Sequence, residues 1–564
     1  MEERIRGIVA STLAELGAPD VAFAVERPAQ LEHGDYAVNA AMAAAKPLGK
    51  NPRELAETLA EKLTAGLGDD AAGIAVAGPG FVNVTLSADA IAKTMAAAMG
   101  EDWGKAKPAT GQSPDAPQGA AFRGNAYYGK RIIVEYSNPN AFKEMHIGHL
   151  MSTVIGEAVS RLIESQGAVM ARDTYGGDVG PHVAKALWAL RRRGSMEPSS
   201  AKELGDAYAH GTRAYEESEE AKKEIDALNQ ALYAGTDAEL MEFWRRCRDI
   251  SMEAFGRVWQ ALGTHFDYFF YDSEAAPVGV EVVRDGLAKG IFEESEGAII
   301  YRGEKKGLHT RVFITSRGTP LYEAKDMGLA FIKEERWPSD ESIIMTAAEQ
   351  SGYFQVILAA LEELAPLIAK KTRHVPHGFL RLTTGKMSSR EGNVITAAGF
   401  LDEIIAKAAE KNADPVVAEQ VAVGAVKYMV LRQQPGADII FDPEKSLSLE
   451  GDSGPYLQYA LVRAKKILTY AGESGGTDAP AEPYDIERRL IHFPEVVARA
   501  ARELAPQLLT QYLTELAGAW NAFYATEQVL GSPEELYKQR MARAFAHTME
   551  QGLGFLGIPA PERM

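Results

Sequence analysis

The spacing of apolar residues in the first hundred positions predicts a unit that combines helices with a sheet. Apolar side chains recur at helical spacing near the amino terminus, at Ile5, Val9 and Leu13. Residues 51–67 repeat this helical pattern, whereas apolar and polar positions alternate over residues 81–86, as in a half-buried strand. We therefore expect residues 1–100 to form a small α+β domain.

A different pattern begins at position 131. A β-rich run over residues 131–136 precedes a series of apolar residues at helical spacing, which ends near Gly167, and a second β-rich run follows over residues 168–175. A strand, helix and strand in this order predict a parallel sheet whose ligand site lies at the carboxyl ends of the strands. We expect a Rossmann-like α/β domain over residues 128–441.

Three further stretches complete the expected organisation. Residues 101–127 are rich in Pro, Gly, Ala and Gln, which is typical of a linker. Residues from about 195 to 262 are strongly helical and charged, and we interpret them as an insertion into the α/β domain without assigning them any chemistry. Residues 442–564 consist almost entirely of amphipathic helices, which predicts an all-α bundle.

Composition narrows the class of protein. The chain has 564 residues, which favours several domains over one core. No apolar run approaches the ~18 residues that a membrane span needs, and the charged amino terminus does not resemble a secretion signal. Cys247 is the only cysteine, so the chain can form neither an intramolecular disulfide nor a cysteine-based zinc site. We expect a cytoplasmic protein without membrane contact, without zinc and without other protein-held metal.

The formal net charge of −18, taken alone, argues against nucleic acid as a partner. Binding depends on local patches, however, and basic residues cluster at Arg191–Arg193 and again at Arg463, Lys465 and Lys466. For each patch by itself, a solvated charged face is the more frequent explanation. Charge therefore leaves the question open.

The sharpest candidate for chemistry is His146-Ile147-Gly148-His149, which directly follows a predicted strand and begins a predicted helix. A helix amino terminus offers unpaired N–H groups and the positive end of a dipole to phosphates, and glycine allows a nucleotide to approach closely. Two imidazoles three positions apart lie on one helical face. By itself, so short a match fits two ordinary histidines equally well.

A second candidate is Lys386-Met387-Ser388-Ser389-Arg390-Glu391-Gly392-Asn393, whose lysine and arginine suit phosphate. The two motifs together resemble the paired signatures of class I aminoacyl-tRNA synthetases. The second departs from the usual Lys-Met-Ser-Lys-Ser, because Ser389 replaces a lysine. In similar sequences with this change a lysine stands upstream of the first motif, and Lys143 matches it.

The surrounding sequence resembles the arginyl-tRNA synthetases over essentially its whole length. The resemblance rests on residues 135–145 before the first motif, on 454–460 and 561–564 near the end, and on 33–39 and 78–83, which look like that family's additional N-terminal domain. It implies a class I synthetase catalytic domain and a C-terminal anticodon-binding bundle.

The resemblance also implies roles for individual residues. His146, His149, Lys143 and Lys386 would be catalytic. ATP would be bound by His146, Gly148, His149, Gly177, Asp178, Phe379, Lys386, Met387, Ser388 and Arg390. Contacts with tRNA are expected at Asn39, Phe81, Tyr456, Gln458, Tyr459, Arg463 and Met564.

An arginine pocket needs a carboxylate for the guanidinium group. Tyr322 and Asp326 are four positions apart on a predicted helix, so they share a face. The resemblance places this pair at the arginine side chain and Glu135, Asn140 and Gln350 around its amino and carboxylate ends. Without the resemblance, Asp326 on a solvated helix is the better explanation.

Family resemblance implies that arginine reacts with ATP and is then transferred to tRNA(Arg), with Mg²⁺ accompanying ATP and activation depending on bound tRNA. We expect a monomer. Two alternatives remain: a paralogue that binds tRNA without catalysis, and a related synthetase for another amino acid. The intact histidine motif and Lys386 argue against the first, and Tyr322 with Asp326 argues against the second.

Overall fold

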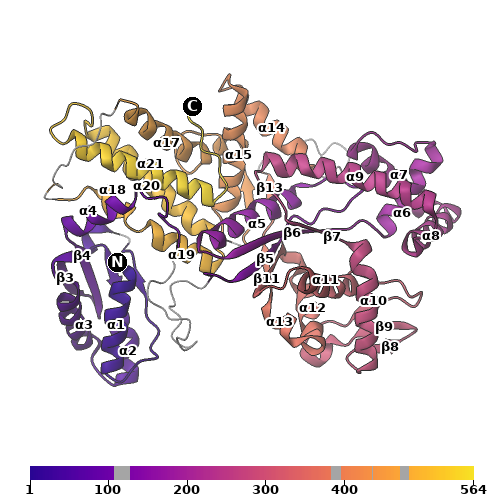
Figure 1. Ribbon diagram of the computed structural model, residues 1–564, viewed down its shortest axis with the longest axis horizontal. Helices are drawn as coiled ribbons and strands as arrows, with labels where there is room; N and C mark the ends of the chain where they lie inside the picture. The colour runs from indigo at the N-terminus through magenta and orange to yellow at the C-terminus, as the bar shows by residue number, and fades with distance from the viewer. Residues whose placement is uncertain (29, 107–126, 383–394, 435, 471–479, 481) are drawn as a thin grey trace.

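The computed structural model describes residues 1–28, 30–106, 127–382, 395–434, 436–470, 480 and 482–564. Figure 1 shows an elongated molecule, with the N-terminal unit in indigo at one end, the C-terminal helices in yellow above it, and the domain of the parallel sheet at the other end. None of the helices in these ranges is long and apolar enough to span a membrane.

The N-terminal unit is an antiparallel sheet covered by helices, with strand order β1-β2-β4-β3. Its elements are α1 (Glu2–Glu15), β1 (Val25–Glu26), β2 (Tyr36–Val38), α2 (Ala40–Leu48), α3 (Pro52–Leu67), β3 (Ala71–Ala77), β4 (Phe81–Leu86) and α4 (Ala88–Ala97). Asn51 caps α3 by accepting from the Arg53 N–H, and Pro52 occupies the first helical position, where no N–H is needed. The predicted small α+β domain is confirmed.

This unit is fastened to the C-terminal helices by buried polar contacts. Asp35 is fully buried and accepts a hydrogen bond from Arg488 Nε at 2.8 Å. The neighbouring Tyr36 hydroxyl donates to Glu495 at 2.8 Å. Both acceptors and donors lie more than 450 positions apart in the chain. The segment that resembles a tRNA-binding domain therefore also serves as a docking surface.

The expected linker over residues 101–127 is packed against the rest of the protein at its described ends. Trp103 is only 7% exposed, stacks on Phe493 and donates from its indole nitrogen to the Thr548 hydroxyl at 3.0 Å. Tyr127 is also buried. These aromatic residues gain more from the apolar surface of the helical bundle than from solvent. Residues 107–126 lie outside the described residues.

The central sheet is parallel and has the strand order β12-β11-β5-β6-β7. Its strands are β5 (Arg131–Glu135), β6 (Val169–Gly176), β7 (Tyr268–Tyr271), β11 (Glu341–Ala347) and β12 (Thr372–His377). The helices between them are α5 (Ile147–Ser165), α6 (Pro181–Arg193), α10 (Asp272–Ala288), α11 (Tyr322–Arg336), α12 (Ser351–Leu364) and α13 (Pro366–Lys371). From β5 the chain adds β6 and β7 on one side of the sheet and then β11 and β12 on the other. The crevice for a ligand therefore opens between the carboxyl ends of β5 and β11.

Two insertions interrupt this sheet domain. The predicted helical insertion is confirmed as α7 (Ala201–Glu217), α8 (Glu219–Ala234) and α9 (Ala238–Ala261). Sequence analysis did not predict the second, an antiparallel sheet formed by β8 (Glu293–Ser295), β9 (Ala298–Tyr301) and β10 (Arg311–Ile314). Its strands are too short to give a clear alternation.

The remaining elements form the C-terminal helices and the connection to them. A short parallel pair, β13 (Leu380–Leu382) with β14 (Ile439–Phe441), brackets α14 (Ala397–Ala409) and α15 (Pro415–Leu431). The helices that follow are α16 (Pro443–Ser446), α17 (Gly454–Leu468), α18 (Asp485–Leu490), α19 (Phe493–Glu503), α20 (Pro506–Thr526) and α21 (Glu535–Phe555). The predicted all-α architecture of this region is confirmed.

The packing of Trp103 can be tested by truncation. Trp103→Ala removes a buried aromatic side chain and its hydrogen bond, so we expect the free energy of unfolding to fall by about 3–5 kcal/mol. Chemical unfolding followed by fluorescence measures this loss. Lys105→Ala, at an exposed position two residues later, is the matched control and should change stability by less than ~0.5 kcal/mol. Equal small effects would contradict the packed arrangement.

Candidate active site

The loop that leaves β5 has an unusual but well-supported path. Ser137, Asn138 and Phe142 have positive φ angles of 74°, 51° and 63°. Such conformations in residues other than glycine persist only where the surroundings enforce them. Asn138 supplies part of that enforcement, since it donates to Glu135 at 2.7 Å and accepts from the Tyr175 N–H at 2.9 Å. The loop therefore delivers the chain to α5 along a fixed course.

The two histidines of the first motif cap α5 reciprocally. His146 Nδ1 accepts from the Gly148 N–H at 3.1 Å, and His149 Nδ1 accepts from the His146 N–H at 3.2 Å. Their rings stack with centroids 3.7 Å apart. The prediction that both imidazoles share one face is confirmed. An added Cβ on Gly148 would lie 2.9 Å from His146 Cε1, so glycine is needed for this packing.

This capping fixes the protonation of both rings. Because each Nδ1 accepts a hydrogen bond, the proton of each neutral ring resides on Nε2. Burial, with the charge of Lys143, lowers the pKa of His146, and burial together with His146 and Lys143 lowers the pKa of His149 to about 3. At neutral pH the site therefore presents two neutral Nε2–H donors beside the amino terminus of α5.

Lys143 supplies the positive charge next to these rings. Its ammonium nitrogen lies 4.4 Å from the centroid of the Tyr208 ring, which belongs to α7. The second motif, with Lys386, Met387, Ser388 and Arg390, lies outside the described residues. Lys143 is thus the lysine that the structure brings to the histidine pair.

Asp326 of α11 is a carboxylate that has no cationic partner among the described residues. Asp326 accepts a hydrogen bond from the Tyr353 hydroxyl at 2.6 Å, and it forms no ion pair with any residue that the structure describes. Burial, with the nearby negative charges of Glu135 and Asp272, raises the pKa of Asp326 to about 8. Tyr322 begins the same helix and is 58% exposed. This group can accept a cationic ligand.

The helix that carries Asp326 is not a solvated one. Glu323 on the same helix is buried and pairs with Arg311 of β10 at 3.0 Å. Burial of α11 between the two sheets removes the explanation of Asp326 as an ordinary surface charge. Arg311 in turn lies over the ring of Tyr353, 5.1 Å from its centroid, so Glu323 is linked through Arg311 to the residue that donates to Asp326.

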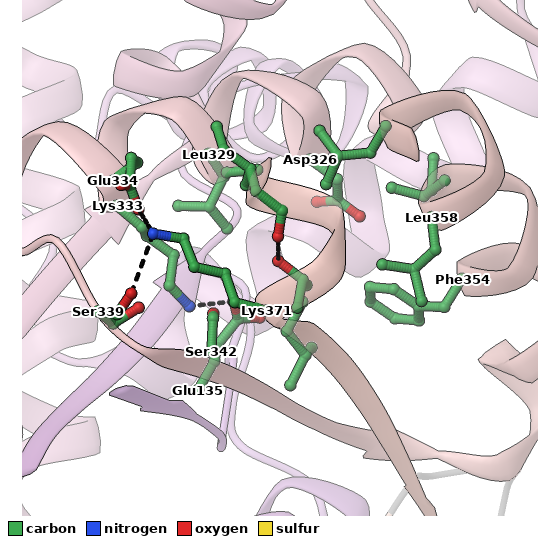
Figure 2. A pocket seen from close by; sticks show the side chains of 16 residues that line it. Glu135, Asp326, Leu329, Lys333, Glu334, Ser339, Ser342, Phe354, Leu358 and Lys371 are labelled. Carbon is green, nitrogen blue, oxygen red and sulfur yellow. Dashed lines mark hydrogen bonds and ion pairs between the residues drawn. The ribbon is translucent and has the colours of Figure 1, made fainter. Parts of the chain in front are cut away.

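Glu135 is engaged in a buried ion-pair cluster. Lys333, from the far end of α11, contacts Glu135 at 3.0 Å and Asp173 of β6 at 2.9 Å. Figure 2 shows Lys333 reaching Glu135 beneath α11, with Asp326 on the opposite side of a cavity of about 40 Å³. That volume suits one or two water molecules rather than an amino acid. Glu135 and Asp326, which are both predicted to bind arginine, line this cavity.

The other predicted ligand-binding residues differ in accessibility. Asn140 packs over Gly177, where an added Cβ would lie 2.1 Å from the Asn140 amide oxygen. Gln350 is exposed just beyond the carboxyl end of β11, and Phe379 is 38% exposed. These residues have access to the crevice edge or to solvent.

Asp178, predicted to bind ATP, is fully buried, and its carboxylate accepts from the Ser273 N–H and hydroxyl, both at 2.8 Å. Its backbone carbonyl accepts from the Trp244 indole at 2.7 Å. The carboxylate thus holds the start of α10.

The residues expected to bind tRNA also differ in their exposure to solvent. Gln458 is fully buried and donates to the carbonyls of Gln420 and Pro559. Phe81 is 37% exposed, whereas Asn39 is half-buried and accepts from the Ala24 N–H. Tyr456 and Met564 are half-buried.

Arg463 stands in an aromatic cluster. Its guanidinium group lies 3.9 Å from the ring centroid of Tyr524 and 5.7 Å from that of Tyr459. It also donates to the Asn521 side chain at 3.0 Å. This cluster combines a charge with partly exposed rings, which suits unpaired bases.

Sequence analysis missed several residues that build the site. Tyr353 holds Asp326, Lys333 joins two strands, and Lys325 of α11 forms a buried ion pair with Asp272 at 2.8 Å. Lysines at buried helical positions give only a faint signal, namely a charge on the apolar face. Tyr208 gave none.

A nucleotide-binding parallel sheet and a helix amino terminus capped by the two motif histidines define a class I aminoacyl-tRNA synthetase. Comparison with known families agrees. Residues 119–443 match the family described as tRNA synthetases class I (R), catalytic domain. Residues 457–564 match the DALR anticodon binding domain, and residues 3–86 match the arginyl tRNA synthetase N terminal domain. The chain belongs to the arginyl-tRNA synthetase family.

Individual relatives cover the chain from end to end. An arginine–tRNA ligase of Yersinia enterocolitica is 32% identical over 99% of this chain and 98% of its own. The solved structure of Thermus thermophilus arginyl-tRNA synthetase is 28% identical, with a TM-score of 0.81 and full coverage of both chains. The structure of the Plasmodium falciparum arginyl-tRNA synthetase, at 19% identity and a TM-score of 0.80, shares the fold.

The fixed tautomers can be observed by nuclear magnetic resonance. With histidine-selective ¹⁵N labelling, we expect the signals of both His146 and His149 to show the Nε2–H tautomer at pH 8 and the His149 signal to show no titration between pH 6 and 8. The pKa of His149 is lowered to about 3, and burial with the charge of Lys143 lowers the pKa of His146 below its usual value, so His146 should be protonated at lower pH than an exposed histidine. His149→Gln identifies the signal. A His149 signal that titrates near pH 6.5 would rule out this arrangement.

Proposed function

We propose that this chain ligates arginine to tRNA in the crevice between β5 and β11, with ATP phosphates at the start of α5 and the guanidinium group at α11. Family membership supplies the reaction: the arginine carboxylate attacks the α-phosphate of ATP, and a ribose hydroxyl of the terminal adenosine, initially the 2′ one, then accepts the arginyl group. The observation that carries the proposal is Asp326, a half-buried carboxylate that forms no ion pair with any described residue.

At the phosphate end, catalysis consists of positioning and charge stabilisation. The Nε2–H groups of His146 and His149 donate to phosphate oxygens, and Gly148 permits close approach of the nucleotide. Lys143 and Lys386 neutralise charge on the α-phosphate and the leaving pyrophosphate, because Ser389 replaces the usual second lysine. Met387, Ser388 and Arg390 complete this side. Mg²⁺ arrives with ATP and is held mainly by phosphates and water.

At the amino-acid end, Asp326 and Tyr322 receive the arginine side chain. A carboxylate matches the planar guanidinium with paired hydrogen bonds, which the compact ammonium of lysine cannot reproduce. Glu135, Asn140 and Gln350 surround the amino and carboxylate groups. Gly177 forms part of the wall, and Phe379 lies on the adenine side.

The tRNA would be held by the N-terminal domain and by the C-terminal helices that pack on it. Phe81 and Asn39 belong to an N-terminal domain of residues 1–100, and Tyr456, Tyr459, Arg463 and Met564 belong to a domain of residues 442–564. The partly exposed ring-and-arginine cluster around Arg463 supports base stacking there. We place the enzyme in the cytoplasm as a monomer.

The direct test is arginine-dependent exchange between ATP and pyrophosphate, with and without tRNA(Arg). We expect exchange with arginine alone among the amino acids, and only when tRNA is present. Absence of exchange under both conditions would indicate a binding protein without catalysis, and exchange with another amino acid would overturn the assigned specificity.

Two lysines should carry the phosphate chemistry. Lys143→Ala and Lys386→Ala each remove a positive charge that stabilises the developing pyrophosphate, so each should lower the activation rate by roughly 10²-fold. The KM for arginine should change much less. Lys105→Ala serves as a distant control. A Lys143→Ala enzyme with the wild-type rate would contradict the compensation for Ser389.

Asp326 should determine the use of arginine. Asp326→Asn leaves the guanidinium group without its counter-charge, so the KM for arginine should rise by at least ~10-fold while the KM for ATP stays near wild type. Steady-state kinetics measure both. Glu335→Gln, at an exposed position on the same helix, is the control. Glu323 is unsuitable because it pairs with Arg311.

The same carboxylate predicts a pH dependence. Below its raised pKa of about 8, Asp326 is protonated in the free enzyme and must lose its proton when the guanidinium group binds. The KM for arginine should therefore fall by up to about tenfold per pH unit as the pH rises toward 8, and level off above it. Asp326→Asn should abolish this dependence; an unchanged profile in the variant would refute the assignment.

A further inference from the structure

The helical insertion contacts the candidate active site through individual side chains. Trp244 of α9 donates to the Asp178 carbonyl, and Tyr233 of α8 lies 5.7 Å from the Lys325 ammonium. Tyr208 of α7 lies 4.4 Å from the ammonium of Lys143. Each of the three helices thus places one aromatic side chain against the site, and in Figure 1 they form a group beside β6 and β7.

The insertion also fixes the residue that precedes Lys143. Phe142 is fully buried in a core shared with Leu204 and Ala207 of α7 and Phe243 of α9. Its N–H donates to the Ser251 hydroxyl of α9 at 3.0 Å, and its φ is 63°. The insertion thus holds both the side chain and the backbone of Phe142. It therefore fixes the backbone position from which the Lys143 side chain extends.

The partner of the Lys143 ammonium group is chemically distinctive. In the part of the chain that the structure describes, Lys143 forms no ion pair with a carboxylate, although Glu144 is its neighbour. A carboxylate would neutralise the ammonium and compete with phosphate for it. The aromatic ring of Tyr208 attracts the cation without neutralising its charge, and its hydroxyl is a neutral partner for only part of the ammonium's N–H donors.

The electrostatic environment agrees with this placement. Lys143 contributes to lowering the pKa of His146, His149 and His182, so its charge is felt throughout the motif. Burial opposes ionisation of Tyr208, yet the charge of Lys143 and a hydrogen-bonding interaction of Lys143 with the hydroxyl lower the pKa of this phenol, with smaller contributions from Thr212 and Lys185. The cation therefore stands between the insertion and the histidine pair.

We propose that Tyr208 is a positioning residue for ATP activation: its ring holds the Lys143 ammonium beside His146 and His149, and the helical insertion thereby sets the phosphate site. The inference rests on the proposed function, which assigns Lys143 to the phosphates. It gives the insertion a role in the chemical step in addition to covering the sheet.

A double-mutant cycle distinguishes positioning from simple packing. The variants are Tyr208→Leu, Lys143→Ala and their combination, with Tyr208→Phe as the conservative change. For each variant we would measure kcat and the KM values for ATP and arginine in tRNA-supplemented pyrophosphate exchange. The thermal unfolding temperature of each variant would be measured as well. Tyr208→Met provides a second variant without an aromatic face should Tyr208→Leu unfold.

We expect Tyr208→Leu to lower kcat by about tenfold with little change in the KM for arginine, and Tyr208→Phe to stay within about threefold of wild type. In the Lys143→Ala background, Tyr208→Leu should cause no further loss, because the group that it positions is absent. Tyr215→Leu is the matched control, because Tyr215 lies on the same helix as Tyr208. Its ring centroid is 4.6 Å from the ammonium nitrogen of Lys185.

Two failures are distinguishable. A wild-type rate in Lys143→Ala would refute the proposed role of Lys143 at the phosphates. A slow Lys143→Ala enzyme combined with a wild-type Tyr208→Leu enzyme would refute positioning by Tyr208, as would losses that multiply in the double variant. A Tyr208 effect equal to that of Tyr215→Leu would likewise overturn the inference.

Discussion

The candidate site depends on one buried ammonium group. Lys333 lies between Glu135 of β5 and Asp173 of β6, at 3.0 and 2.9 Å, with almost no exposure to solvent. Removal of one partner from such a cluster costs about 3–5 kcal/mol, because a charge is left buried and unpaired. The contact fixes α11 against the strand that leads to the histidine motif. The amino-acid end and the phosphate end of the site are thereby held in one frame.

The helix that begins at the histidine motif also connects this frame to the C-terminal helices. Arg161, near the end of α5, pairs with Glu157 and donates to the Gly554 carbonyl of α21. Lys427 of α15 donates to the Gly557 carbonyl, just beyond the same helix. A change in the packing of the helical bundle would therefore act directly on the element that caps the phosphates.

Local patterns predicted much of this molecule because they depend on neighbouring residues. The strand over residues 81–86 and the helix after Asn51 were predicted from periodicity. The pairing of the two histidines followed from their three-residue spacing. The second insertion was missed because its strands are short, and composition did not reveal what Trp103 packs against.

The sequence by itself determined the family, the parallel-sheet class and the position of the histidine motif, since motif spacing and hydrophobic periodicity are written in consecutive residues. Only the tertiary structure decided which carboxylates are free. Asp178 is bonded to Ser273, 95 positions away, and Glu135 to Lys333, 198 positions away, whereas Asp326 accepts from the Tyr353 hydroxyl and forms no ion pair with the described residues. Partners so distant in the chain are set by how helices pack on the sheet, and no local pattern carries that information.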